Sequence, residues 1–437
     1  SKFKSCLSSR AATIMDFAGE ITDPVHRSIR FSQVEKQVID CPAFQRLRRI
    51  RQLAGAHLVY PSAQHSRFEH SLGAMHIAGL AGESLLGKGY IDNAEVVQEL
   101  RLAALLHDIG HGPFSHLFEE VLEYRRKTSH EETGKKIITK SEISDILGKH
   151  GHSSEQISRL SFAPVKVNFM NEIISGSLSA DLMDYLPRDG LFTGAEYAKV
   201  DYYRIVASLE VWKNRLAINK SALNSLESML ISRYEMFKAV YFHKTVRSAE
   251  VMLLNSMIAA DESLGLTDTS LENYLSLTDE ATLERLCKVN DGPKSAFAAR
   301  LALDYRDRRL LKSVYEKFLH KRDSRRMDRR TLKTLGSQIA DAAHVDSDYV
   351  FVDASRAPSM PLTPSKQEMD SVLTVDKEKV EEMPISRIPL VESISGFFDM
   401  VRVYTTAEYR EKVERSVKKV LGAQESLHME GGRSHGQ

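Results

Sequence analysis

The stretch Leu105-Leu106-His107-Asp108-Ile109-Gly110-His111-Gly112-Pro113 places an imidazole and a carboxylate side by side at the end of an apolar helical segment. Burying both groups without a counter-ion would be costly. Adjacent side chains on a helix diverge by about 100 degrees, so His107 and Asp108 can bind one ion only beyond the helix end. The two glycines and the proline that follow end a helix at that point. The stretch therefore indicates a metal site at a helix terminus of a mainly α protein.

Two further residues supply ligand atoms of the same kind. His70 lies in Ser66-Arg67-Phe68-Glu69-His70 on an expected earlier helix, and Asp181 opens a later acidic helix. Taken singly, either histidine is equally well explained as a hydrogen-bonded core residue, and Asp181 as a cap or a solvated carboxylate. Together the four residues form a nitrogen and oxygen ligand set without sulfur, which favours Mn or Fe(II), with Zn and Mg as further candidates. Such an ion would polarise a phosphoryl oxygen and lower the pKa of a bound water.

More ionisable residues gather near the same loop. They are His111, His116, His130, Glu119 and Glu131. A histidine hydrogen-bonded to a carboxylate has a raised pKa, which suits protonation of a leaving oxygen. Arg67 precedes His70 by three residues on one helical face, where a guanidinium can bind phosphate. Arg233, Tyr241 and His243 recur on a later helix, but spacing alone favours an exposed arginine, a core tyrosine and a surface histidine.

The composition narrows the class of protein. The chain has 437 residues, with 60 basic and 59 acidic side chains, so a global basic field for nucleic acid is absent. Cys6, Cys41 and Cys287 have no paired spacing and indicate neither a disulfide framework nor a cysteine zinc site. No apolar run approaches the roughly 18 residues that span a bilayer, and the N-terminus lacks a secretory signal pattern. We expect a cytoplasmic protein that does not enter a membrane.

Apolar periodicity predicts helices over most of the chain, with a small mixed α+β lobe near the C-terminus. The expected divisions are an N-terminal tail (1–21), a catalytic domain (22–264), a helical extension (265–345), a mixed α+β lobe (346–425) and a disordered tail (426–437). Helices are predicted over 72–86, 94–106, 173–186 and 222–260, with a helical layer over 271–319. Another helix is predicted to open at Asp40 and Pro42 and to run through residue 53. Strands are predicted near 349–352 and 400–404.

The chain resembles the HD-domain phosphohydrolase superfamily. Within it, the chain is similar to the deoxynucleoside triphosphate (dNTP) triphosphohydrolases of the sterile-alpha-motif and HD-domain type. The similar segments are Asp23-Pro24-Val25-His26, Phe44-Gln45-Arg46-Leu47-Arg48, Gln52-Leu53, Arg67-Phe68-Glu69-His70-Ser71-Leu72-Gly73, His107 to His116, Asp184-Tyr185 with Arg188-Asp189, and Arg233 to Lys244. The resemblance covers about residues 20–260 well and the rest loosely.

The resemblance implies water attack at the α-phosphorus of a dNTP, giving a deoxynucleoside and inorganic triphosphate. It implies one divalent ion (Mn, Fe, Zn or Mg) and a further Mg bound with the nucleotide. The metal ligands would be His70, His107, Asp108 and Asp181. The acid/base pair would be His111 and Glu119, with His130 nearby on phosphate. Arg67 and Arg233 would hold the triphosphate. The sugar would meet Gln52, Leu53, Tyr185, Asp189 and Tyr241, which would exclude a 2′-hydroxyl, and His116 would stack on the base.

The resemblance also implies an allosteric homotetramer with a guanine nucleotide or dNTP bound between subunits as activator. Asp40, Gln45 and Arg48 match the positions that read guanine there. Taken alone, Asp40 as a helix cap and Arg48 as a solvated charge explain these residues equally well. Residues 321–330 hold six basic side chains, for which a solvated helix face is favoured. A role there in binding effector phosphates or single-stranded nucleic acid is the sharper hypothesis.

Three positions depart from the family pattern. Glu119 stands in place of an aspartate, Leu182 in place of a lysine that contacts phosphate, and Phe237 in place of a histidine. The last two weaken the grip on phosphate and leave substrate preference open. The alternatives are therefore an HD-type nucleotidase, cyclic-nucleotide or alarmone hydrolase, or a regulator that binds nucleotide or nucleic acid without catalysis.

Overall fold

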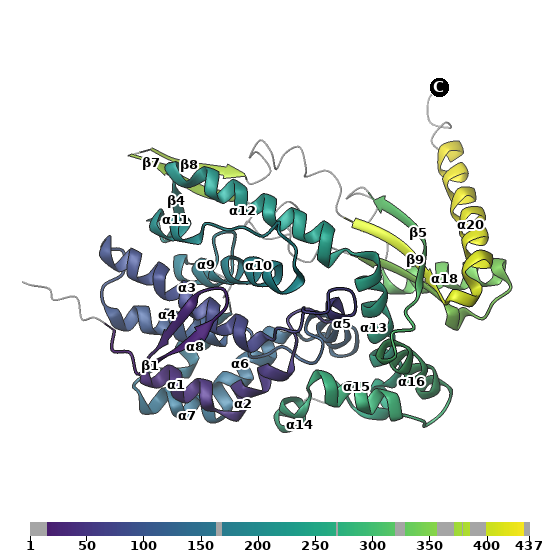
Figure 1. Ribbon diagram of the computed structural model, residues 1–437, viewed down its shortest axis with the longest axis horizontal. Coiled ribbons are helices and arrows are strands. Elements are labelled where there is room, and N and C mark those ends of the chain that lie inside the picture. The colour runs from purple at the N-terminus through teal and green to yellow at the C-terminus, as the bar shows by residue number, and fades with distance from the viewer. Residues whose placement is uncertain are drawn as a thin grey trace, which may run out of the picture.

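The computed structural model describes residues 15–162, 168–267, 270–319, 328–355, 371–377, 379–384 and 399–431. Within these residues, helices form the main body, and short strands form three small sheets (Figure 1). This confirms the mainly α fold with a small sheet-containing C-terminal region. Of the two predicted tails, residues 1–14 and 432–437 lie outside the described residues.

The predicted metal ligands lie on or directly after three helices: α3 (Arg67–Gly87), α4 (Ala94–Leu106), which His107 and Asp108 follow, and α10 (Ala180–Thr193). Helix α3 packs against both others. Ser66 and Glu69 form a capping box at the start of α3, and the Asn93 side chain caps α4. The caps fix where these helices begin, and α4 has the predicted bounds.

The other helices of the first 264 residues surround these three. They are α1 (Gln33–Asp40), α2 (Pro42–Gln45), η1 (Arg46–Arg49), η2 (Ala56–Leu58), α5 (His116–Arg126), α6 (His130–Lys140), α7 (Glu142–Lys149), α8 (Ser154–Ser161), α9 (Phe169–Ile174), α11 (Tyr202–Ala207), η3 (Lys220–Ala222), α12 (Leu223–Met236), η4 (Phe237–Tyr241) and α13 (Lys244–Leu264).

Several of these boundaries correct the predicted helices. The helix expected through residue 53 stops at Arg49, because Ile50 turns to an extended conformation. Asp40 ends α1, and the N-cap of α2 is Cys41, so the cap role expected for Asp40 is wrong. The helix expected over 173–186 is broken between α9 and α10. The helix expected over 222–260 is interrupted by the π-helical turn η4, which apolar periodicity does not reveal.

Residues 22–264 also contain strands that the predominantly helical prediction missed. Strands β1 (Gly19–Asp23) and β2 (Arg27–Phe31) form a hairpin. Strands β3 (Leu209–Trp212) and β4 (Arg215–Asn219) pair around Lys213 and Asn214, whose φ angles are 46° and 64°. A turn of this kind usually carries glycine, and the Lys213-Asn214 pair is therefore a weak signal for a hairpin.

The second hairpin joins a distant part of the chain. Strands β7 (Ser371–Asp376) and β8 (Lys379–Pro384) extend the sheet in the order β3-β4-β7-β8. Strand β4 pairs with β7 in parallel, with Ala217 opposite Leu373. The C-terminal third of the chain therefore pairs directly with the region that follows α11.

The remaining elements follow α13 along the chain. They are α14 (Leu271–Ser276), α15 (Asp279–Lys288), α16 (Pro293–Arg306), β5 (Lys312–Leu319), α18 (Arg329–Ala343), η5 (Ser347–Tyr349), β6 (Val350–Ser355), β9 (Asp399–Thr405), η7 (Ala407–Tyr409) and α20 (Arg410–Gly431). Strand β9 lies between β5 and β6, and α18 and α20 pack beside this sheet with a small apolar core of their own (Figure 1).

The strands expected near 349–352 and 400–404 are confirmed by β6 and β9. Strand β5 corrects the helical layer expected over 271–319, because residues 312–319 pair with β9. Most of the basic segment 321–330 lies outside the described residues. None of the helices that the structure describes has the length and apolar character needed to cross a bilayer.

Candidate metal centre and active site

The four predicted ligand residues converge at the ends of α3, α4 and α10. Ligand atoms of His70, His107 and Asp108 lie within 4.8 Å of one another, and all three residues are buried. The two Nε2 atoms of the histidines are 3.3 Å apart. Asp181 lies beside both histidines, with its Oδ1 atom 3.1 Å from His70 Nε2 and 3.8 Å from His107 Nε2. The cluster could hold a divalent metal ion, because imidazole nitrogens and carboxylate oxygens face one point.

The second ring nitrogen of each histidine is already engaged. His107 Nδ1 donates to the carbonyl oxygen of Ala104 at 2.7 Å. His70 Nδ1 donates to Asp184 Oδ2 at 2.8 Å. Both hydrogen bonds orient Nε2 toward the cluster, as carboxylate–histidine–metal arrangements require.

Asp184 is a supporting residue that the sequence reading missed as such. It is fully buried, and its Oδ1 accepts from His26 Nε2 at 2.6 Å and from Arg188 Nη2 at 2.9 Å. Burial raises the pKa of Asp184, but Arg188 and the histidines outweigh it and hold the pKa well below its usual range. Gly73 leaves room for this network, since a Cβ there would lie 1.8 Å from Asp184 Oδ1. The spacing of Asp184 and Arg188, four residues apart on one helix, was the available signal.

The charges around the cluster are strongly coupled. Arg67 forms an ion pair with Asp108. Burial raises the pKa of Asp108, but Arg67 outweighs it and keeps that carboxyl ionised. Burial lowers the pKa of His70, but hydrogen bonds to Asp181 and Asp184 outweigh it and raise the pKa to about 10. A metal ion would therefore have to displace a proton from this imidazole.

A histidine–glutamate cluster lies beside the ligands. Glu119 Oε1 accepts from His130 Nδ1 at 2.5 Å, and His116 Nδ1 lies 3.4 Å from Glu119 Oε2. The His111 ring stacks on His130, with centroids 4.0 Å apart, and its Nε2 is 3.3 Å from Asp108 Oδ1. The hydrogen bonds of Glu119 thus go to His130 and His116, which differs from the expected direct pairing of Glu119 with His111.

The surroundings of this cluster keep Glu119 ionised and His111 neutral. Burial raises the pKa of Glu119, but hydrogen bonds from His116 and His130 outweigh it and hold the carboxylate ionised. Burial and the positive charge of Arg67 lower the pKa of His111 well below its usual range, so this imidazole is neutral. The partly exposed members are therefore the ones suited to exchanging a proton.

A second polar group extends along α10. Tyr185 is hydrogen-bonded to Arg233, and burial raises the pKa of the tyrosine to about 12. Asp189 accepts from the Tyr241 hydroxyl at 2.6 Å, and its other oxygen is 2.7 Å from His65 Nε2. His65 was missed, because only the fold brings it to Asp189.

The π-helical turn η4 places Tyr241. The backbone amide of Phe242 donates to the carbonyl oxygen of Phe237 at 2.7 Å, which is the wider repeat of a π turn. The Phe237 ring packs edge-on against Tyr241 with centroids 5.0 Å apart. The phenylalanine that departs from the family pattern therefore supports Tyr241 by packing.

Gln52 and Leu53 lie next to the same region. The backbone amide of Gln52 donates to the carbonyl oxygen of His65 at 3.0 Å. Among the described residues, Gln52 Oε1 is a buried acceptor without a hydrogen-bond partner. A buried acceptor of this kind is suited to a ligand hydroxyl.

The three expected activator residues lie on the surface side of α1–η1. Asp40 is exposed. Gln45 Nε2 donates to the carbonyl oxygen of Ile39 at 2.7 Å, and its Oε1 accepts from Arg48 Nε at 2.8 Å. The Arg48 guanidinium stacks 3.5 Å from the centroid of the Phe68 ring. These contacts explain Gln45 and Arg48 locally without excluding a ligand.

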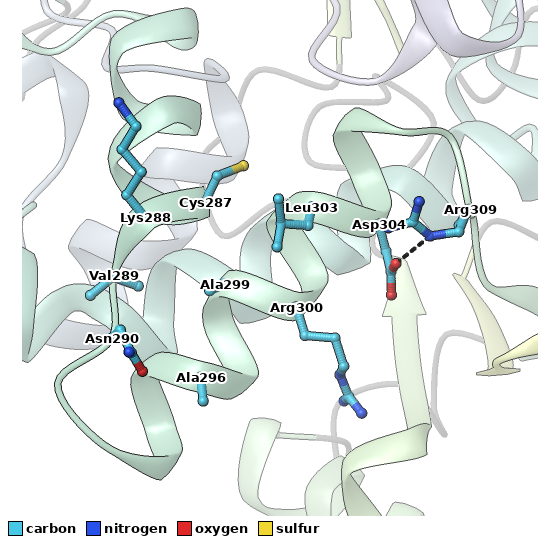
Figure 2. A pocket seen from close by; sticks show the side chains of 10 residues that line it. All are labelled: Cys287, Lys288, Val289, Asn290, Ala296, Ala299, Arg300, Leu303, Asp304 and Arg309. Atoms are coloured by element: carbon cyan, nitrogen blue, oxygen red, sulfur yellow. Dashed lines mark hydrogen bonds and ion pairs between the residues drawn. The ribbon is translucent and has the colours of Figure 1, made fainter.

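A hollow of about 420 Å³ lies away from this centre, between α15 and α16. Figure 2 shows its lining, where Asp304 pairs with Arg309. The Arg300 guanidinium donates a hydrogen bond to the carbonyl oxygen of Asp348. The charges that line this hollow already have partners in the chain, and it contains none of the predicted site residues.

Comparisons with known proteins agree with this geometry. The HD domain family matches residues 67–189, and the HD associated region matches residues 200–430. The crystal structure of a hypothetical protein from Aquifex aeolicus covers 92% of this chain and 100% of its own, with a TM-score of 0.73 and 30% identity. The uncharacterized protein MJ1154 of Methanocaldococcus jannaschii is 37% identical over 62% of this chain and 58% of its own. The deoxynucleoside triphosphate triphosphohydrolase SAMHD1 homolog of Dictyostelium discoideum is 30% identical over 68% of this chain and 60% of its own.

The helical core, the cluster that could hold a metal ion and the adjoining acid/base groups define a metal-dependent phosphohydrolase class of site. The chain belongs to the HD-domain phosphohydrolase family that carries an HD associated region. The chain spans about three fifths of the length of the two curated relatives above.

Proposed function

We propose that the protein hydrolyses dNTPs to a deoxynucleoside and inorganic triphosphate. The observation that carries the proposal is the four-residue spacing along α10. Asp181 lies with the metal ligands, Tyr185 lies against Arg233, and Asp189 is held by Tyr241. A ligand lying along this face meets a metal site, then an arginine, then a closed tyrosine–aspartate pair. Phosphates followed by a sugar fit that order of groups.

A divalent ion held by His70, His107, Asp108 and Asp181 would supply Lewis-acid activation of the phosphoryl group and of the attacking water. Arg67 and Arg233 bring positive charge to the triphosphate. Both are buried, so their charge is poorly screened by solvent. Neutralising and orienting the phosphates is most of what such a reaction requires.

The histidine–glutamate cluster supplies the proton that the leaving group takes. Glu119 accepts a hydrogen bond from His130 and contacts His116, and the leaving 5′-oxygen takes a proton from one of these two imidazoles as the bond to phosphorus breaks. His111 stays neutral and ties this cluster to Asp108. The sugar lies against Leu53, Gln52, Tyr185 and the Asp189–Tyr241 pair, with His116 beside the base.

The proposal includes an activated homotetramer, with Asp40, Gln45 and Arg48 contacting a guanine nucleotide or dNTP. Support for this part is the resemblance together with the exposure of Asp40 and Arg48 on the surface of α1–η1. Light scattering with and without GTP measures it. A mass that stays that of a monomer with GTP and dNTP present would contradict it.

A second candidate is an HD-type phosphohydrolase that acts on another nucleotide. Leu182 and Phe237 favour it, since both are buried and apolar where the resemblance implies phosphate-binding groups. Fewer such groups leave a weaker grip on a triphosphate.

Product analysis of the purified protein tests the proposal. Each dNTP and NTP is incubated with Mn or Mg, with and without GTP, and the products are separated by chromatography. We expect deoxynucleoside and triphosphate from dNTPs. Orthophosphate, a nucleoside monophosphate or no product would reject the proposal and favour the second candidate.

A further inference from the structure

The turn that carries the acid/base histidines has a strained backbone. Phe114 and Ser115 have φ angles of 58° and 55°, and neither residue is a glycine. Ser115 also has a ψ of −117°, a combination that ordinarily requires glycine. Such conformations are strained for residues with a side chain and persist only where surrounding contacts impose them. The turn joins His111 to His116, so its shape sets where both rings point.

Contacts from α14 and α15, far along the chain, impose this conformation. Asp279 Oδ1 accepts from the backbone amide of Phe114 at 2.7 Å, and its Oδ2 accepts from the backbone amide of Arg51 at 3.0 Å. The Tyr274 hydroxyl donates to the carbonyl oxygen of Gly110 at 2.6 Å. The Asp279 side chain is 1% exposed, so water does not replace these hydrogen bonds.

The same contacts tie the turn to the phosphate-binding side. The Ser115 hydroxyl donates to the carbonyl oxygen of Arg51 at 2.7 Å and accepts from Arg67 Nε at 2.7 Å. Arg67 in turn pairs with Asp108. Asp279 therefore binds the backbone N–H of Arg51, and Ser115 binds the carbonyl oxygen of the same residue.

We propose that Asp279 is a positioning residue that holds the strained 111–116 turn. It thereby sets the His116 ring, which contacts Glu119, and the His111 ring, which stacks on His130, for proton transfer by the histidine–glutamate cluster. Asp279 touches neither the metal ligands nor the groups assigned to substrate; it binds two backbone amides, and its Oδ2 also lies 3.5 Å from Arg51 Nη1. The inference deepens the proposed function and rests on it for the reaction concerned. It assigns part of the HD associated region to control of the catalytic turn.

The test compares Asp279→Asn with Glu280→Gln in the full chain. The amide keeps the shape of the carboxylate but presents an N–H to one of the two backbone amides. Burial raises the pKa of Asp279 to about 6, against which the amide hydrogen bonds and Arg51 act, so the substitution removes a charge that burial already disfavours. Glu280 is the matched control, because it also binds Arg51, at 2.7 Å, but is 69% exposed and does not reach the turn.

Three measurements are made on each variant and on the wild type. Hydrogen exchange of a peptide spanning residues 110–118 reports the grip on the turn. NMR signals of labelled histidine rings report the His111 and His116 orientation without turnover. Steady-state kinetics with a dNTP and Mn, with metal content measured in parallel, reports the reaction.

In Asp279→Asn we expect faster exchange, shifted ring signals and a kcat lower by about tenfold to a hundredfold, with KM and metal content nearly unchanged. Glu280→Gln should match the wild type in all three. Unchanged exchange or unchanged ring signals in Asp279→Asn would overturn the inference. Faster exchange with an unchanged kcat would overturn its catalytic part. If the wild type hydrolyses no dNTP, the proposed function fails, while exchange and ring signals still decide whether Asp279 holds the turn.

Discussion

The metal-ligand half of the site and its proton-handling half are held in place by different means. His70 and His107 are at most 9% exposed and lie at helix ends, where each has its second ring nitrogen bonded by a carboxylate or a carbonyl. Glu119, His130 and His116 are 27%, 20% and 61% exposed, and His116 directly follows the turn in which Phe114 and Ser115 have positive φ angles.

This difference indicates a division of labour. The metal-ligand half is fixed by buried charges on neighbouring helices, as a site that selects an ion requires. The proposed proton-handling half is partly exposed to solvent, and Asp279 and Tyr274 from a remote segment are hydrogen-bonded to the backbone of the neighbouring turn. Substitutions in the metal-ligand half should therefore lower the metal content. Substitutions in the proton-handling half should lower turnover.

The largest expected effect is that of Asp181→Ala. Removing a carboxylate from the four-residue cluster should abolish both metal binding and turnover, because the remaining ligands surround the ion less completely. Metal content by mass spectrometry and product analysis measure the two losses. Asp92→Ala, which alters an exposed aspartate between α3 and α4, is the control. Full turnover by Asp181→Ala would remove this residue from the site.

The next effect, that of Glu119→Gln, should appear in kcat alone. A neutral amide binds the His130 and His116 imidazoles more weakly than a carboxylate does, so we expect kcat to fall by about 10²–10⁴-fold. Metal content should stay at the wild-type level. Glu123→Gln lies one turn further on α5, is exposed, and serves as the control. A loss of metal from Glu119→Gln would show that the two halves are not separate.

Asp184→Asn should weaken metal binding by about 10–100-fold, because the amide no longer fixes the His70 ring. A metal titration measures the affinity, and thermal unfolding shows whether the fold survives the loss of the Arg188 pair. Asp23→Asn is the control, since Asp23 binds Arg188 at 2.8 Å on its other side without contacting His70. Equal metal affinity in the two variants would refute the role of Asp184.

The smallest effect concerns pH. The raised pKa of His70, about 10, stabilises the metal-free fold below pH 6.5, and this contribution is lost as the pH rises through 10. An ion must displace this proton, so its affinity should rise about tenfold per pH unit for each proton released between pH 6 and 8. Calorimetry in buffers of different ionisation enthalpy counts the protons. An affinity independent of pH would contradict the charge state assigned to His70.

The sequence predicted what short-range patterns determine. The apolar helical pattern predicts α4 to its bounds, and the His107–Asp108 pair indicates the cluster that could hold a metal ion. What it missed depends on long-range contacts. Asp279 reaches Phe114 across 165 positions, and His65 reaches Asp189 across 124. The π turn before Phe242 was missed for another reason, because one inserted residue hardly changes apolar periodicity.

The parallel pairing of β4 with β7 has a consequence for the newly made chain. Ala217 leaves the ribosome long before Leu373, its partner, has been synthesised. One edge of β4 must therefore wait unpaired while helices α12 to α18 emerge, and an unpaired edge is a template for association with other chains. Folding of this sheet should finish late in translation, and holding chaperones would protect the exposed edge until then.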